Sequence, residues 1–270
     1  MLRHLLLLAS SLLAFTAASH AALVSQYVGL DTLSTLATGT YAGLPNPNQG
    51  RLTFLFAHPS DTTPSTNHYH PIGTYRYSGP AATPIVENFG TNYQIPETYT
   101  GQPPQPLTMT SGGLFNGRLT LQYNPANEYS DPVFNATRML QSFPVGTPEA
   151  FMYNSSGGRY NGDLTNAITA LQLISLSPGL HVGKATQLDI VQNPYDTHLL
   201  GFGNSINFEP IFWTAAAAPE GIYSARFRLV DLTNTAQPSG EFVFNLAVVP
   251  EPGSATLALL SVGLLLRRRR

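Results

Sequence analysis

The chain has 270 residues, no cysteine, and 13 basic against 15 acidic residues, which gives a formal net charge of −2. The lack of cysteine excludes disulfides, thiolate zinc sites and cysteine nucleophiles. Without Arg3, Glu251 and the four terminal arginines, 8 basic and 14 acidic residues remain, with no basic patch. We therefore expect no nucleic-acid partner.

The N-terminus has the pattern of a secretory signal peptide over residues 1–21. Arg3 precedes an almost wholly apolar run over residues 5–18, and Ser19 and Ala21 place small residues at the −3 and −1 positions of a cleavage site. A membrane anchor fits less well, because this run is shorter than the roughly 20 residues that span a bilayer. The sequence therefore predicts export and cleavage after Ala21.

Residues 22–248 are predicted to form one all-β body, an antiparallel β-sandwich or jelly-roll-like fold. Short runs rich in aromatic and β-branched residues alternate with Gly, Pro and Asn turns, whereas helical periodicity is scarce. Strands are expected at 51–58, 72–77, 114–123, 168–176, 187–191, 207–214, 222–232 and 241–249. The last two are expected to pair as a hairpin. Residues 96–106 and 144–158, which are rich in Pro and Gly, are predicted to be surface loops.

A histidine cluster follows the first of these strands and is the strongest chemical signal in the body. His58 ends the strand, and His68 and His70 lie two residues apart, so that their imidazoles share one face of an extended segment. Neutral imidazoles suit zinc, copper or nickel. We expect a zinc site of His58, His68 and His70, with Asp61 or His198 able to complete the coordination.

Other interpretations of these residues remain open. Loop histidines are commonly solvated and bind nothing. Glu97, Glu128 and Asp131 could be brought together as paired carboxylates for glycoside hydrolysis, but no spacing supports this. No nucleophile elbow, zinc-protease motif or phosphate-binding loop is present, so we expect no enzyme. The tyrosines could stack on sugars, although packing within the fold is the commoner role.

The body also resembles a group of exported proteins whose expression is controlled by the zinc-uptake repressor. The segments that carry the resemblance are residues 67–79, 208–213, 221–224, 226–231 and 239–242. The resemblance implies a role under zinc limitation, and through that role a metal-binding function for His68 and His70. It assigns no ligand directly.

The C-terminal segment, residues 249–270, has three parts in a fixed order. A proline-flanked glutamate is followed by an uncharged apolar run over 255–266 and then by four arginines. Twelve apolar residues are short for a bilayer span, and arginines are retained on the cytoplasmic side. We therefore expect an apolar sorting helix that inserts into the membrane only transiently.

These three parts resemble the PEP-CTERM sorting signal of Gram-negative bacteria. The matching residues are Pro250, Glu251, Pro252, Arg267, Arg268, Arg269 and Arg270. The resemblance implies recognition by the membrane protease-transpeptidase exosortase, an inner-membrane intermediate, and release to the cell surface or extracellular space.

The expected function is thus an exported, exosortase-processed protein that binds zinc. The expected partners are exosortase, the export machinery, the inner membrane for a time, and an extracellular polysaccharide. The alternatives are a structural or adhesive matrix protein without metal, or a carbohydrate-binding module.

Overall fold

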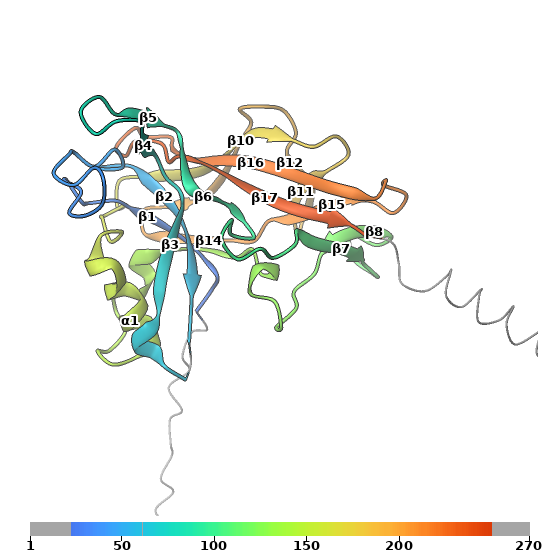
Figure 1. The fold of residues 1–270 in the computed structure, drawn as a ribbon. Coiled ribbons are helices and arrows are strands. Elements are labelled where there is room, and N and C mark those ends of the chain that lie inside the picture. The colour runs from blue at the N-terminus through green and yellow to red at the C-terminus, as the bar shows by residue number, and fades with distance from the viewer. Residues whose placement is uncertain (1–22, 61, 250–270) are drawn as a thin grey trace, which may run out of the picture.

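A computed structural model describes residues 23–60 and 62–249 of the chain (Figure 1). The predicted signal peptide, Asp61 and the predicted sorting signal lie outside the described residues. Among the residues that are described, no helix is long and apolar enough to cross a membrane.

Strands make up most of the regular secondary structure. The longest are β2 (Leu52–His58), β6 (Phe89–Ile95), β10 (Ile168–Leu176), β16 (Gly221–Asp231) and β17 (Glu241–Val248). The shorter strands are β1 (Gln26–Leu30), β3 (His68–Gly73), β4 (Arg76–Ser78), β5 (Ile85–Glu87), β7 (Gln105–Met109), β8 (Arg118–Leu121), β9 (Phe134–Ala136), β11 (His181–Lys184), β12 (Gln187–Val191), β13 (Thr197–Phe202), β14 (Ser205–Phe208) and β15 (Ile211–Ala215). The all-β prediction is confirmed.

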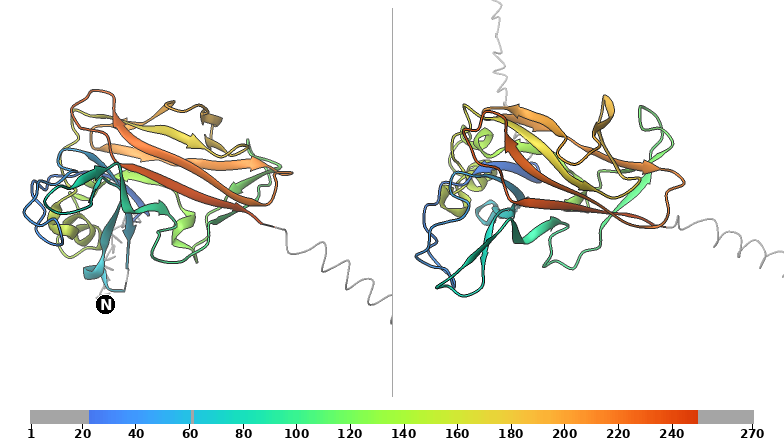
Figure 2. Two further views of the ribbon diagram at one scale, coloured as in Figure 1. Left: turned by 45° about the horizontal axis from the view of Figure 1, so that its top comes forward. Right: turned by 90° about the horizontal axis from the view of Figure 1, so that it is seen from above.

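The strands form one large curled sheet with a small β4–β5 ribbon beside it (Figures 1 and 2). The order along the sheet is β12-β11-β15-β8-β7-β17-β16-β10-β13-β14-β9-β1-β2-β3, and β6 also pairs with β17. Most strand pairs are antiparallel, as expected, but β1–β9, β17–β6 and β17–β7 are parallel pairs. Since β6 and β7 both run beside β17 in its own direction, the sheet is mixed.

The curl of the sheet brings β2 face to face with β17, although many strands separate the two in the sheet order. Phe54 of β2 stacks on Phe242 of β17 with ring centroids 4.1 Å apart. Phe244 completes this contact and lies 5.8 Å from Phe54. Phe54, Phe242 and Phe244 are almost fully buried, so this aromatic layer forms the centre of the core.

The last two strands pair as the predicted antiparallel hairpin, with Tyr223 opposite Leu246 and Phe227 opposite Phe242. Strands β10 and β12 also have the expected bounds. The run 72–77 is divided instead between β3 and β4, and the run 207–214 between β14 and β15. In the latter case Pro210, which lacks a backbone N–H, falls between the two strands.

The second face of β2 packs against a smaller core. Leu55, Ala57 and Tyr69 of β2 and β3 meet Met152 there. Met152 belongs to α1 (Pro148–Asn154), so the prediction that residues 144–158 form only a loop is wrong. Thr147 caps this helix by accepting a hydrogen bond from the Ala150 N–H, and Pro148 occupies its first turn. Both faces of β2 are therefore buried along the strand, up to its last residue, His58, which is partly exposed.

Candidate metal centre

The histidines of the cluster lie side by side because β2 and β3 form an antiparallel hairpin. His58 is opposite His68, and Phe56 is opposite His70. Side chains alternate between the faces of a strand, so all four share one face while Tyr69 points into the smaller core. The hairpin thus places three imidazoles at the open end of the aromatic core.

Asn67 fixes the loop that joins the two strands. Its side-chain oxygen accepts a hydrogen bond from Ser60 N, and its amide nitrogen donates to Pro148 O at the start of α1. Asn67 is buried. These bonds tie the first residue before β3 to both the loop and the helix, so the position of His68 does not depend on the loop alone.

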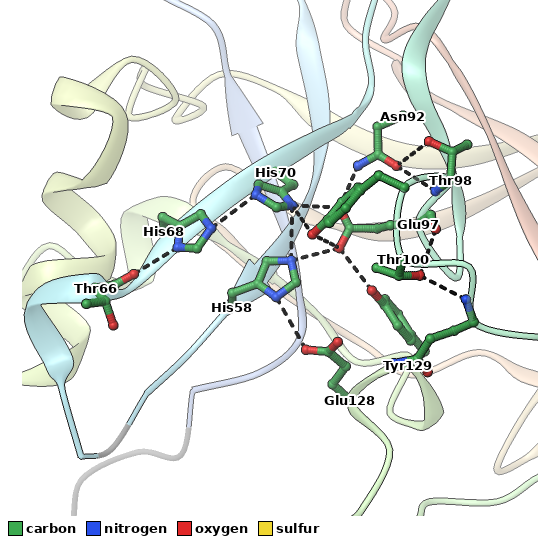
Figure 3. A network of polar contacts seen from close by, with 12 residues as sticks. His58, Thr66, His68, His70, Asn92, Glu97, Thr98, Thr100, Glu128 and Tyr129 are labelled. Atoms are coloured by element: carbon green, nitrogen blue, oxygen red, sulfur yellow. Dashed lines mark hydrogen bonds and ion pairs between the residues drawn. The ribbon is translucent and has the colours of Figure 1, made fainter.

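Glu97 enters the cluster from a distant part of the chain, directly after β6, which contacts β3. Its side chain is fully buried. Its Oε2 lies 2.7 Å from His58 Nε2, and its Oε1 lies 2.7 Å from His70 Nδ1 (Figure 3). The two imidazole nitrogens are 3.1 Å apart. His58, His70 and Glu97 therefore direct one ligand atom each toward a common point, all within 4.8 Å of one another.

His68 contacts His70 on the side of the ring that faces away from Glu97. This contact determines which ring nitrogen of a neutral His70 carries the proton. His68 Nδ1 lies 2.8 Å from Thr66 O, which can only accept, so this nitrogen is the donor. A neutral His68 then accepts at Nε2, which lies 3.1 Å from His70 Nε2. His70 then donates from Nε2, so that in a neutral His70 the lone pair lies on Nδ1, the nitrogen that faces His58 and Glu97. The arrangement selects the tautomer that a metal ligand requires.

Glu128 has the corresponding place behind His58. Its Oε2 lies 3.3 Å from His58 Nδ1, the ring nitrogen that points away from the cluster. Although burial lowers the pKa of His58, hydrogen bonds to Glu128 and Glu97 outweigh it and raise the pKa to about 9. A carboxylate behind an imidazole is the usual partner of a metal-bound histidine, because it orients the ring and raises its basicity.

Three further side chains orient Glu97. Tyr129, whose ring stacks on Phe56, donates its hydroxyl to Glu97 Oε2 at 3.1 Å. Asn92 donates to Oε1. The Tyr99 hydroxyl lies 3.4 Å from Oε2 and 3.0 Å from His70 Nδ1. Burial raises the pKa of Glu97, but hydrogen bonds from His58, Asn92 and His70 outweigh this and lower it, so the carboxyl group is ionised at neutral pH.

The donor set of two imidazoles and one carboxylate fits a divalent transition metal. Zinc sites with three protein ligands keep a fourth position for water or another ligand. With Zn–N distances of about 2.0–2.1 Å, tetrahedral ligand atoms lie roughly 3.3 Å apart. The observed separations of 2.7 and 3.1 Å are slightly smaller. Zinc would therefore need the three side chains to separate by a few tenths of an ångström, which the partly exposed rings of His58 and His70 allow.

The predicted site is only partly the site in the structure. His58 and His70 are brought together as expected, whereas His68 lies behind His70 rather than in the group of three. Asp61 lies outside the described residues. His198 is not part of that group: it lies on β13, with its ring centroid 5.0 Å from that of Phe208.

Sequence reasoning missed Glu97 as a ligand and considered it only as one of three carboxylates for hydrolysis. Of those three, Glu97 and Glu128 both contact His58, but Asp131 is not part of the group. No local motif links Glu97 to the histidines. Its only sequence signal is a lone acidic residue between Pro96 and a run of threonine and tyrosine.

The second histidine–carboxylate pair of the described body, His181 and Asp189, has no third ligand. His181 Nδ1 lies 2.8 Å from Asp189 Oδ1, and the ring stacks on Trp213 with centroids 4.0 Å apart. A comparison with known proteins gives no further guidance on either pair, because the chain matches no protein-family model, no curated protein and no solved structure.

Proposed function

We propose that this protein binds a divalent metal ion, zinc in the first instance, through His58, His70 and Glu97. The observation that carries the proposal is the convergence of three ligand atoms from two distant parts of the chain. Carboxylates and histidines on a protein surface are often close together without binding a metal. Here, however, the carboxylate of Glu97 is fully buried. Burying an ionised group is costly unless partners compensate, and a metal ion is one such partner.

The surroundings support the same function. Each imidazole has an acceptor behind the nitrogen that points away from the cluster: Glu128 for His58, and His68 for His70. Without a metal, protons must occupy the short gaps between the ring nitrogens and Glu97, since lone pairs at 2.7 Å repel. A metal would replace those protons and release them to solvent.

Calorimetric zinc titration of the purified protein tests the proposal. We expect one stoichiometric site in the parent and its loss in His70→Ala. His198→Ala is the matched control, because it removes a strand histidine that lies outside the group, and it should bind zinc like the parent. An absence of binding in the parent, or a parent-like isotherm in His70→Ala, would leave the alternative of a structural or adhesive matrix protein without metal.

We further propose that the metal-binding body acts outside the cytoplasm, after export and exosortase processing. The support is the sequence alone: the signal-peptide pattern of residues 1–21, and the PEP-CTERM resemblance of residues 249–270. On this proposal the mature chain begins at Ala22 and ends near Pro250–Pro252. Intact-mass measurement of protein from the host surface tests it, and a mass that includes Arg267–Arg270 would contradict it.

A further inference from the structure

A large cleft adjoins the metal centre and is not explained by it. The cleft has a volume of about 840 Å³ and shares His70, Asn92 and Tyr99 with the cluster. From His70 the lining continues along the chain through Tyr75 to Tyr77 on β4. The volume of the cleft lies within the usual range of ligand sites, roughly 300–1,000 Å³.

Four tyrosines are among the residues that line the cleft. Tyr41, Tyr75 and Tyr77 are half-buried, and Tyr99 is exposed. The rings of Tyr41 and Tyr77 lie 5.3 Å apart. Their hydroxyls are already used, since Tyr41 donates to Gly79 O and Tyr77 to Pro45 O. What remains available on these two residues is the ring surface, held in place before any ligand arrives.

The charges of the lining are balanced within the protein. Arg76 bonds to Glu87 through Nε at 2.6 Å, and Arg159 bonds to buried Asp31 through Nε at 2.8 Å. Among the described residues that line the cleft, no carboxylate is present. A polyanion would find no uncompensated arginine, and a purely apolar ligand would meet few aliphatic side chains. Arg76 still has guanidinium N–H donors beyond those bonded to Glu87 and Thr91.

From these observations we propose that the cleft beside the metal centre binds a neutral carbohydrate chain. Sugar rings have C–H faces that pack on aromatic rings, and hydroxyl edges that accept and donate hydrogen bonds. The fixed rings of Tyr41 and Tyr77 supply the first kind of contact, and Arg76 with the exposed Thr91 hydroxyl supplies the second. This binding does not require the metal, so it goes beyond the proposed function and can fail independently of it.

Affinity electrophoresis of the purified protein through gels that contain a neutral polysaccharide tests the proposal. The panel is a β-glucan, an α-glucan, a xylan, a galactomannan and soluble chitin fragments, with polygalacturonate as the anionic comparison. We expect at least one neutral polymer to retard the protein, in the presence of zinc and of EDTA alike. Tyr77→Ala should weaken that binding about tenfold or more, as truncation of a central aromatic contact does.

Two controls separate ring contact from loss of folding. Tyr77→Phe keeps the ring and removes the bond to Pro45, so it should bind like the parent. Tyr195→Ala removes a surface tyrosine that is 69% exposed and does not line the cleft, and it should also bind like the parent. Retardation by none of the neutral polymers would overturn the proposal, as would unchanged binding by Tyr77→Ala. Neither result would affect the zinc site, which the titration tests separately.

Discussion

Replacement of Glu97 by glutamine should destabilise the protein and abolish its response to zinc. In the parent, the two carboxylate oxygens face His58, His70, Asn92 and Tyr129. Glutamine keeps the shape of the side chain but turns one acceptor into an NH₂ group, which faces donors whichever way the amide is oriented. At least one buried hydrogen-bonding position is therefore lost, along with the negative charge.

The size of the effect follows from these contacts. A hydrogen bond to a charged group contributes about 1.5–3 kcal/mol, and about two such bonds are lost. The two imidazoles can give up their protons and reach water, so we expect a net loss of about 3 kcal/mol rather than the full sum. For a body of this size, 1 kcal/mol shifts Tm by about 2–4 °C, so Tm should fall by about 6–12 °C.

Zinc provides the second measurement in the same assay. Zinc at 100 times its Kd would stabilise the parent by about 2.7 kcal/mol, which corresponds to a rise in Tm of about 5–11 °C. The Glu97→Gln variant should show little of this rise. Differential scanning calorimetry of both proteins, with zinc and with EDTA, measures the two effects together.

Asp189→Asn is the matched control. It alters a histidine–carboxylate pair with a similar separation, 2.8 Å, but without a third ligand and with partly exposed side chains. It should change Tm little and keep the zinc response. The reasoning would be refuted by a Glu97→Gln variant that melts like the parent and responds to zinc like the parent.

Three further predictions concern positioning and pH. His68→Ala should weaken zinc binding about 10- to 100-fold, and His68→Gln less, because a glutamine oxygen can still accept from His70; equal calorimetric affinities for parent and His68→Ala would contradict the tautomer assignment. The pKa of His58 is raised to about 9, so zinc must displace a proton at neutral pH, and its affinity should increase from pH 6 to pH 9; a flat profile in competition titrations counts against this. Although burial raises the pKa of Asp231, hydrogen bonds from Thr233, Thr235 and Ala236 lower it overall. Its stabilisation is therefore full above the unfolded pKa of about 3.9 and is lost as pH falls further. Asp231→Asn should cost about 2 kcal/mol in urea unfolding at neutral pH and progressively less below pH 4; a constant difference would argue against the assignment.

The sequence predicted best the strands that contain no glycine or proline. Residues 168–176 and 187–191 have the expected bounds because their β-branched and aliphatic side chains have no competing turn signal. Helix α1 was missed because Pro and Gly around it suggested a loop. The capping signal was nevertheless present in Thr147, Pro148 and Glu149, and Met152 supplies the apolar face.

The candidate site divides in the same way. His58, His68 and His70 could be grouped from the sequence because a hairpin is a local structure, and alternation along a strand decides which side chains share a face. Glu97 could not be added to this group from the sequence, because its position depends on β6 running parallel to β17 and beside β3. Pairing between strands so far apart in the chain leaves no periodic signal in one sequence. His198 was included on residue type alone, and it is not in the group that the fold brings together.

The central claim is that one metal ion binds between His58, His70 and Glu97. Anomalous diffraction at the zinc absorption edge, from crystals of the protein grown with zinc, tests this most directly. The account predicts a single strong peak within bonding distance of His58 Nε2, His70 Nδ1 and a Glu97 oxygen, with Glu128 still behind His58. A cluster without a peak, or a zinc ion bound only at His181 and Asp189, would contradict it.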